Sequence, residues 1–283
     1  MILVNAFLAI FFIFATPQIL LYYKYNNLKY SLILIIGVVI SLSMSWVIFL
    51  ISFIFGIDNI YLYILSLLSF LYTLLIVYKN THYERNNNIF RIWILSLTIM
   101  IPSLIYFGYG YNAWDAIVSW NRWAIELYDN IYQSINAAYP ILLPAIWSLI
   151  YKIQGTSEIW FTSQLTLFFL PLILVVFLLT LFKETHEKTY LFILVLIYPY
   201  LVWRWTYIGY MDMPVMLIGL LSIISMYTAE VYKNKGNNEF ICYIYLVLLL
   251  SGTASLVKQA GLMFLIFNLV YLKTIYFYSK GKK

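Results

Sequence analysis

The feature that most constrains this chain is its succession of long apolar runs. Several of them reach about 18 residues or more with almost no charge, which is the length of a helix that crosses a bilayer. Of the 283 residues, 64% are hydrophobic and only 10% are charged, which is too little polar surface for a soluble domain of this size. The alternating segments of an outer-membrane barrel, about ten residues each, are absent. The sequence therefore predicts an all-α, polytopic transmembrane helical bundle.

About nine spans are expected, and no internal repeat is visible. Their expected ranges are 2–23, 30–56, 59–78, 90–110, 158–182, 189–208, 213–232, 240–257 and 261–278. A tenth apolar segment, 141–153, would cover only about 20 Å of a hydrocarbon core of about 30 Å. We expect three preliminary transmembrane helices in residues 1–89 and a functional module in residues 90–283, with a large outer loop at 108–157.

The basic residues indicate how the spans are oriented. The net charge of +6 comes from single lysines and arginines at the ends of spans, so we interpret it as fixing orientation rather than as binding nucleic acid. The loops after the first, third and seventh spans and the C-terminal tail are basic, which places them in the cytoplasm. The loop 108–157 then lies outside, but only if segment 141–153 does not cross. These rules predict a multi-pass protein of the cytoplasmic membrane with a cytoplasmic C-terminus.

The outer loop contains the stretch "NAWDAIVSWNRWA", residues 112–124. In a helix, its apolar side chains form one stripe: Ala116, Trp120, Trp123, Ala124 and Leu127. Such a helix is expected in the membrane plane, with its tryptophans at headgroup depth. Asp115 stands at the expected helix N-terminus, where a carboxylate can cap free N–H groups. The stretch by itself also fits a purely structural role, with Asp115 as a cap and the tryptophans as anchors.

Two further outer segments carry charge. "RWTYIGYMDMP" (204–214) contains Arg204 and Asp212, and "SLVKQAGL" (255–262) contains Lys258 in a tight turn. Ionisable groups close to a bilayer are costly unless they pair or serve a site. We therefore expect these side chains to gather with Asp115 on the outer face. As alternatives, Arg204 and Lys258 would reach lipid headgroups and Asp212 would cap a helix.

Four motifs occur in a suggestive order: "WDA" (114–116), "YPILLP" (139–144), "GYMDMP" (209–214) and "KQAGL" (258–262). In this order the chain resembles the GT-C glycosyltransferases, which are integral membrane enzymes that use polyprenyl-phosphate-linked sugars. It is most similar to the branch of protein mannosyltransferases and aminoarabinose transferases, over about residues 90–275. At the fourth motif, Gln259 replaces an acid common in that branch. Because those enzymes are usually longer, the chain is interpreted as a short member, a partner-dependent half or a truncated remnant.

The resemblance implies a helical bundle whose first outer loop bears juxtamembrane helices, and it assigns catalytic carboxylates to Asp115 and Asp212. Asp115 would be the base for an acceptor hydroxyl, with partial desolvation by Trp114 and Trp120 raising its pKa. Arg204 and Lys258 would hold the donor phosphate. The remaining expected substrate-binding residues are Trp114, Tyr111 and Tyr139.

The expected partners are the lipid bilayer, a polyprenyl-phosphate sugar donor, and a glycan, lipid or protein acceptor. A divalent cation, Mg²⁺ or Mn²⁺, would be shared by Asp115 and Asp212 if one is used. Two other classes fit the composition: a transporter or flippase for a lipid-linked or small polar solute, and a non-catalytic remnant. Transporters usually place charges or broken helices near mid-membrane, whereas these span interiors are nearly free of charge.

Overall fold

A computed structural model describes residues 2–25, 28–79, 87–106, 110–131, 139–235 and 239–280 of the chain. Within these ranges the secondary structure is helical and contains no strand, which confirms the all-α prediction. The chain divides into two compact units. Unit 1 comprises residues 1–136 and 142–210, and unit 2 comprises residues 137–141 and 211–283. The three N-terminal helices belong to unit 1 together with later helices, so residue 90 is not a boundary between compact units.

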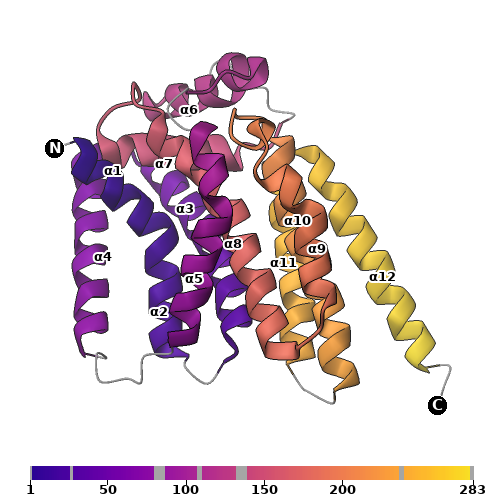
Figure 1. Ribbon diagram of the computed structural model, residues 1–283. Helices are drawn as coiled ribbons and strands as arrows, with labels where there is room; N and C mark the ends of the chain where they lie inside the picture. The colour runs from indigo at the N-terminus through magenta and orange to yellow at the C-terminus, as the bar shows by residue number, and fades with distance from the viewer. Residues whose placement is uncertain are drawn as a thin grey trace. The chain divides into compact units, whose positions relative to one another are not determined.

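Unit 1 contains the long helices of the N-terminal two thirds of the chain (Figure 1). They are α1 (Ile2–Ile10) and α2 (Thr16–Lys24), joined by a π-helical turn, then α3 (Tyr30–Ile54), α4 (Asn59–Lys79), α5 (Asn87–Met100), α8 (Phe161–Thr185) and α9 (Thr189–Leu201). The Glu184 carboxylate accepts hydrogen bonds from the backbone N–H and the hydroxyl of Ser31. This contact places a negative charge at the N-terminus of α3, where the helix dipole favours it, and fastens α8 to α3.

Seven helices of the described chain are long and apolar enough to cross a membrane, which supports an integral membrane protein. They are Ile2–Lys24, Tyr30–Ile54, Asn59–Lys79, Asn88–Tyr106, Phe161–Thr185, Asp212–Asn234 and Phe240–Val257. The span expected at 189–208 is too long, because α9 ends at Leu201 after 13 residues. Pro199 removes a helical hydrogen bond, and the chain then turns through a short 3₁₀-helix at Arg204–Thr206.

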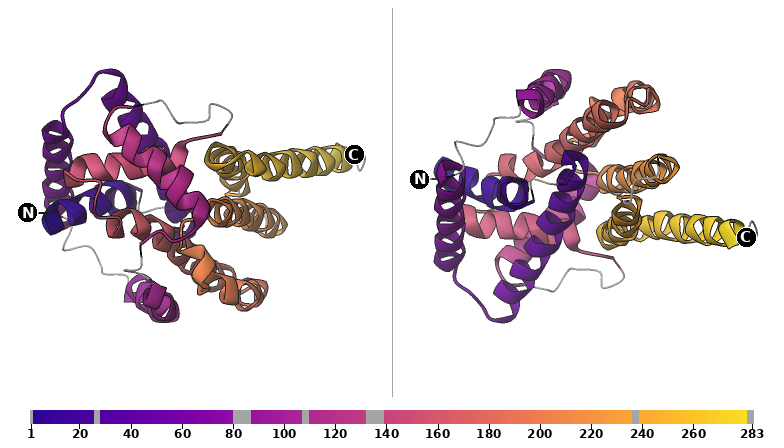
Figure 2. Two further views of the ribbon diagram at one scale, coloured as in Figure 1. Left: turned by 90° about the horizontal axis from the view of Figure 1, so that it is seen from above. Right: turned by 90° about the horizontal axis from the view of Figure 1, so that it is seen from below.

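Two helices of unit 1 lie across one end of the long helices: α6 (Asn121–Tyr128) and, beneath it, α7 (Leu142–Gln154) (Figures 1 and 2). All 13 residues of α7 are buried, and α7 contacts α1, α3, α4, α6 and α8. Neighbouring helices therefore cover segment 141–153, while the expectation that it does not cross the membrane stays a prediction. Its high apolar content is explained by this protein environment.

The amphipathic stripe is confirmed. Ala116, Trp120, Trp123, Ala124 and Leu127 are all buried, over a π-helical turn (Ala116–Trp120) and α6. The stripe covers α7, because α6 packs on that helix. Trp120 and Trp123 are therefore core residues, with ring centroids 5.0 Å apart, rather than headgroup anchors.

Unit 2 contains α10 (Asp212–Asn234), α11 (Phe240–Val257) and α12 (Leu262–Lys280), which pack on one another. The Asn268 amide of α12 donates to the Ser222 hydroxyl of α10 at 3.0 Å. Gly219 lies under the Phe264 ring, whose nearest atoms are 2.4 Å from the position that a Cβ would take. A small residue at 219 thus allows α12 to approach α10 closely.

Candidate functional site

The first and second outer segments are joined directly in unit 1. The backbone N–H of Ala113 donates to the carbonyl of Ile208 at 3.2 Å. Gly209 has φ +104°, and a Cβ there would be 2.5 Å from the Cβ of Ala116 and 2.8 Å from the Tyr111 ring. Only glycine fits this backbone conformation at so close an approach. The "WDA" and "GY" motifs therefore meet because of one glycine.

Their junction forms a cavity of about 400 Å³ that opens to the surface. A neighbouring hollow of about 360 Å³ shares Asn112, Arg204 and Ile208 with it. The polar and aromatic side chains lining the first cavity are Asn112, Trp114, Trp203, Arg204, Trp205 and Tyr210. Several flat aromatic faces beside one guanidinium favour a ligand that has both an apolar ring face and an anionic group.

Arg204 is exposed, and no ion pair is found for it among the described residues of unit 1. The five N–H donors of the guanidinium are therefore placed where a ligand can reach them. Trp114 is 73% exposed, so most of its indole can also be covered by a ligand. The ring centroids of Trp205 and Tyr210 are 5.2 Å apart, which gives that wall a continuous aromatic surface.

Asp115 is exposed and follows Trp114 in the first turn of the outer helix. Its backbone is already helical, with φ −59° and ψ −34°, and its side chain makes no capping hydrogen bond. The expected N-cap role is therefore wrong. The expected desolvation by Trp120 is also absent, since Trp120 is buried under the helix while Asp115 faces outward. Asp115 remains accessible to a ligand entering beside Trp114.

Tyr111 is buried and cannot offer its face to a sugar, so the expected role in substrate binding is wrong. Its ring stacks on Trp147, with centroids 4.7 Å apart, and its hydroxyl donates to Ser163 Oγ at 2.9 Å. Burial, reinforced by the nearby Tyr151, raises the pKa of the Tyr111 phenol well above its ordinary value. The neutral phenol therefore serves as a fixed donor that positions the segment bearing Trp114 and Asp115.

A buried polar network extends this support. The Tyr151 hydroxyl lies 2.6 Å from Asn121 Oδ1 and 2.8 Å from Ser163 Oγ, linking α7 to α6 and α8. Trp147 Nε1 donates to Thr166 Oγ1 at 2.8 Å. Sequence patterns gave no signal for this network, because its members are scattered over three helices and each looks like an ordinary core residue.

Asp212 and Lys258 lie in unit 2 and form an ion pair, with Lys258 Nζ 2.7 Å from Asp212 Oδ1. The segments that carry Asp212 (204–214) and Lys258 (255–262) therefore meet, as part of the expected gathering. Gly261 explains how: a Cβ there would lie 2.1 Å from the carbonyl oxygen of Ala254, so the turn after α11 requires glycine. Because each unit is described by itself, the gathering of Asp212 and Lys258 with Asp115 and Arg204 stays a prediction.

Tyr139 is partly exposed at 39% and belongs to unit 2, so its proposed contact with a substrate also stays a prediction. Within the described ranges, no group of three or more His, Cys, Asp or Glu residues is arranged to hold a metal ion. Asp212 already accepts from Lys258, which would have to be displaced if a cation were to use both of its oxygens.

In comparisons with known proteins, no family model, no curated protein and no solved structure matches this chain.

Proposed function

We propose that this protein is an integral membrane glycosyltransferase of the GT-C type. It would move a sugar from a polyprenyl-phosphate donor to an acceptor hydroxyl at the outer face of the cytoplasmic membrane. One observation supports this most: the first and second outer segments form a single aromatic cavity containing the exposed Arg204, with the exposed Asp115 directly after the cavity residue Trp114. Seven apolar helices of spanning length supply the membrane setting that a lipid-linked donor needs.

The chemistry assigns one role to each group. Arg204 would bind the donor phosphate, and its charge would stabilise the phosphate as it departs. Trp114 and the neighbouring tryptophans would cover the sugar ring. Asp115 would accept the proton of the acceptor hydroxyl as its oxygen bonds to the anomeric carbon. The bond between that carbon and the phosphate oxygen breaks, and polyprenyl phosphate leaves with the electron pair. A single displacement of this kind inverts the anomeric configuration.

A transfer assay tests this assignment. The chain would be reconstituted with polyprenyl-phosphate mannose or polyprenyl-phosphate aminoarabinose carrying a labelled sugar, and release of the label from the lipid would be followed. Asp115→Asn should lower the rate about 10²- to 10⁴-fold, the usual contribution of a general base. Asp129→Asn is the matched control, because Asp129 is an exposed acid in the same outer loop. Unchanged turnover in a correctly inserted Asp115→Asn protein would end the proposal.

Arg204→Gln tests the phosphate site separately. Loss of one charged group that stabilises the departing oxygen is expected to cost about 10²- to 10³-fold in turnover. Arg122→Gln controls for a lost surface arginine, since Arg122 is 60% exposed and pairs with Glu126 on its own helix, at 3.0 Å. Equal losses in the two variants would contradict a phosphate contact at Arg204.

The proposal includes nine spans with a cytoplasmic C-terminus, in which α9 and α12 cross although they fall outside the seven apolar helices of spanning length. It also requires that α7 not cross. Cysteines at Asp129 and Glu158 flank α7 and lie on exposed residues, and Cys242 can be replaced by serine beforehand. An impermeant thiol reagent should label both positions from outside intact cells. Labelling from opposite sides would mean that α7 crosses and that every later loop is inverted.

A further inference from the structure

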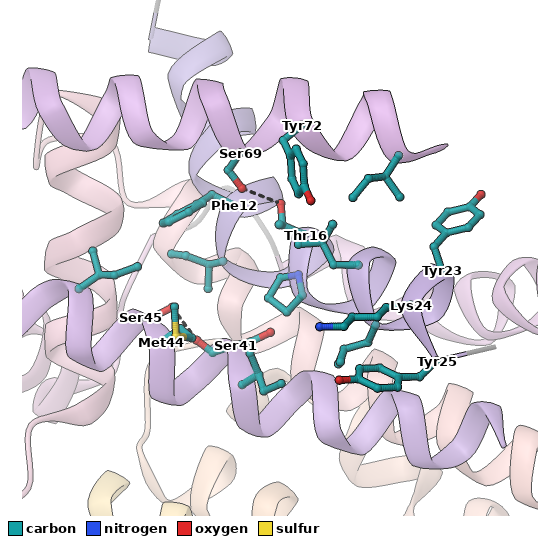
Figure 3. Close-up of a pocket in the computed structure, with 17 residues that line it drawn as sticks. Phe12, Thr16, Tyr23, Lys24, Tyr25, Ser41, Met44, Ser45, Ser69 and Tyr72 are labelled. Atoms are coloured by element: carbon teal, nitrogen blue, oxygen red, sulfur yellow. Dashed lines mark hydrogen bonds between the residues drawn. The ribbon is translucent and has the colours of Figure 1, made fainter. Parts of the chain in front are cut away.

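The N-terminal part of unit 1 contains a groove that the proposed transfer reaction does not use (Figure 3). It lies between α2, α3 and α4 and has a volume of about 740 Å³. Its walls are mostly aliphatic and aromatic, with a few hydroxyl groups and one cation, Lys24. This volume falls in the range of about 300–1,000 Å³ that is usual for sites of small ligands.

The groove is separate from the cavity containing Arg204. Lys24 ends α2, and that end of α2 lies opposite the end of unit 1 where α6 and α7 cross (Figure 1). Met44 and Tyr72 on the groove walls are 52% and 58% exposed, so the groove opens sideways. Since the three helices belong to candidate spans, that opening faces lipid.

Among the residues that the structure describes, two polar groups of the groove lack a full set of partners. Lys24 Nζ lies 5.4 Å from the centroid of the Tyr25 ring and points along the groove toward Ser41 (Figure 3). Ser41 is 2% exposed, and its hydroxyl has no hydrogen-bond partner among the described residues. By contrast, the Ser45 hydroxyl donates to the carbonyl of Ser41, and the Ser69 hydroxyl to Thr16 Oγ1.

We propose that this groove binds one anionic phospholipid of the bilayer. A hydrocarbon chain would lie along the apolar walls of α2, α3 and α4. The phosphate would face the Lys24 ammonium, and the Ser41 hydroxyl would donate to a phosphate or ester oxygen of the same lipid. Apolar walls open to the membrane, one cation and one unmatched donor are together complementary to this class of molecule. A zwitterionic lipid fits less well, because its own ammonium competes with Lys24 for the phosphate.

Thermal unfolding of the purified 283-residue chain in non-ionic detergent tests this proposal. Phosphatidylglycerol should raise the unfolding midpoint in a saturable way, and phosphatidylcholine with the same chains should raise it less. Lys24→Gln should require about fivefold more phosphatidylglycerol for the same rise, the effect of one lysine near an anionic surface. Met44→Trp, which fills the groove from an exposed position, should weaken the response to both lipids.

Lys183→Gln is the matched control. Lys183 is an exposed lysine in the last turn of α8 that does not line the groove, so this variant should respond as the wild type does. Glycerol phosphate, the headgroup without chains, should produce no rise. The proposal is overturned if the wild type responds equally to the two lipids, if Lys24→Gln and Lys183→Gln are weakened alike, or if glycerol phosphate alone suffices.

Discussion

Lys258 donates a hydrogen bond to Asp212 across 2.7 Å and so ties the turn after α11 to the first residue of α10. The carboxylate also stands at the N-terminus of α10, where the helix dipole favours a negative charge. The pair neutralises most of the charge that Lys258 could offer to a phosphate. Within the proposed enzyme, Arg204 therefore supplies more of the positive charge than Lys258 does.

From this pairing we predict that Lys258→Gln lowers turnover less than Arg204→Gln does, and that it barely changes stability. Asp212 is 60% exposed and Lys258 23%, so solvent screens their attraction. Exposed pairs of this kind contribute about 0–1 kcal/mol to the free energy of unfolding. Denaturant titration in detergent with and without high salt would measure this, and a loss of several kcal/mol would contradict it.

Gly261→Ala should strongly destabilise unit 2. The added Cβ would lie 2.1 Å from the backbone carbonyl oxygen of Ala254, which cannot move without distorting the end of α11. Gly252→Ala, within α11 itself, is the matched control, because nothing lies within 4 Å of its new Cβ. Helix propensity alone should make that control more stable by about 0.5–1 kcal/mol. Opposite shifts in unfolding midpoint are expected, and similar shifts would show that the turn tolerates a side chain.

Gly209→Ala should damage the aromatic cavity and with it the transfer reaction. Gly209 and Gly155 both have left-handed backbones, with φ +104° and φ +85°, so alanine is strained at either position. Only at 209 does the Cβ also clash, with Ala116 and Tyr111, whereas nothing lies within 4 Å at 155. We expect both variants to lose some stability, and Gly209→Ala alone to lose most of its turnover. Equal turnover in the two variants would show that the proposed site does not depend on glycine at position 209.

Lys152 should make stability depend on pH. It is 1% exposed, and its ammonium donates to Asn130 Oδ1 at 2.8 Å and to Ser52 Oγ at 3.3 Å. Burial lowers the pKa of Lys152 below its ordinary value of 10.5. Between that lowered pKa and 10.5 the unfolded chain binds more protons, so stability rises with pH across this window. This rise in stability with pH should be missing in Lys152→Met. If the variant keeps the same pH profile, the rise comes from another titrating group.

Much of this fold follows from apolar periodicity, and particular residues show where that reasoning stops. The stripe from Ala116 to Leu127 is visible in the sequence because a helix places residues three or four apart on one face. The same pattern does not tell whether the apolar face of the helix packs against lipid or against protein. In this structure it packs against α7. The end of α9 at Leu201 was missed because apolar residues continue through the turn that follows, where Gly209 rather than hydropathy decides the backbone.

The site is harder to predict for a related reason. Trp114 was expected from the "WDA" motif and Arg204 from the charged segment 204–214, and both line the cavity. Tyr111 was expected there as well, yet it is buried against Trp147. The sequence could not show this, because an aromatic side chain next to a motif fits a core position as well as a ligand site. Trp203, Trp205 and Tyr210 were not singled out. Their density around Arg204 was the available signal, but it takes the bond between Ala113 and Ile208 to bring them to Trp114.

The complete burial of the short helix α7 should protect its backbone from solvent. With all of its residues enclosed, its amide hydrogens should exchange with solvent as slowly as those of helices nearly twice its length, even though it lies at an end of the unit. The face of α7 that lies under α6 becomes exposed only when α6 and the outer segment that carries Asp115 lift away. Loss of activity and the onset of exchange in α7 should therefore occur at the same denaturant concentration.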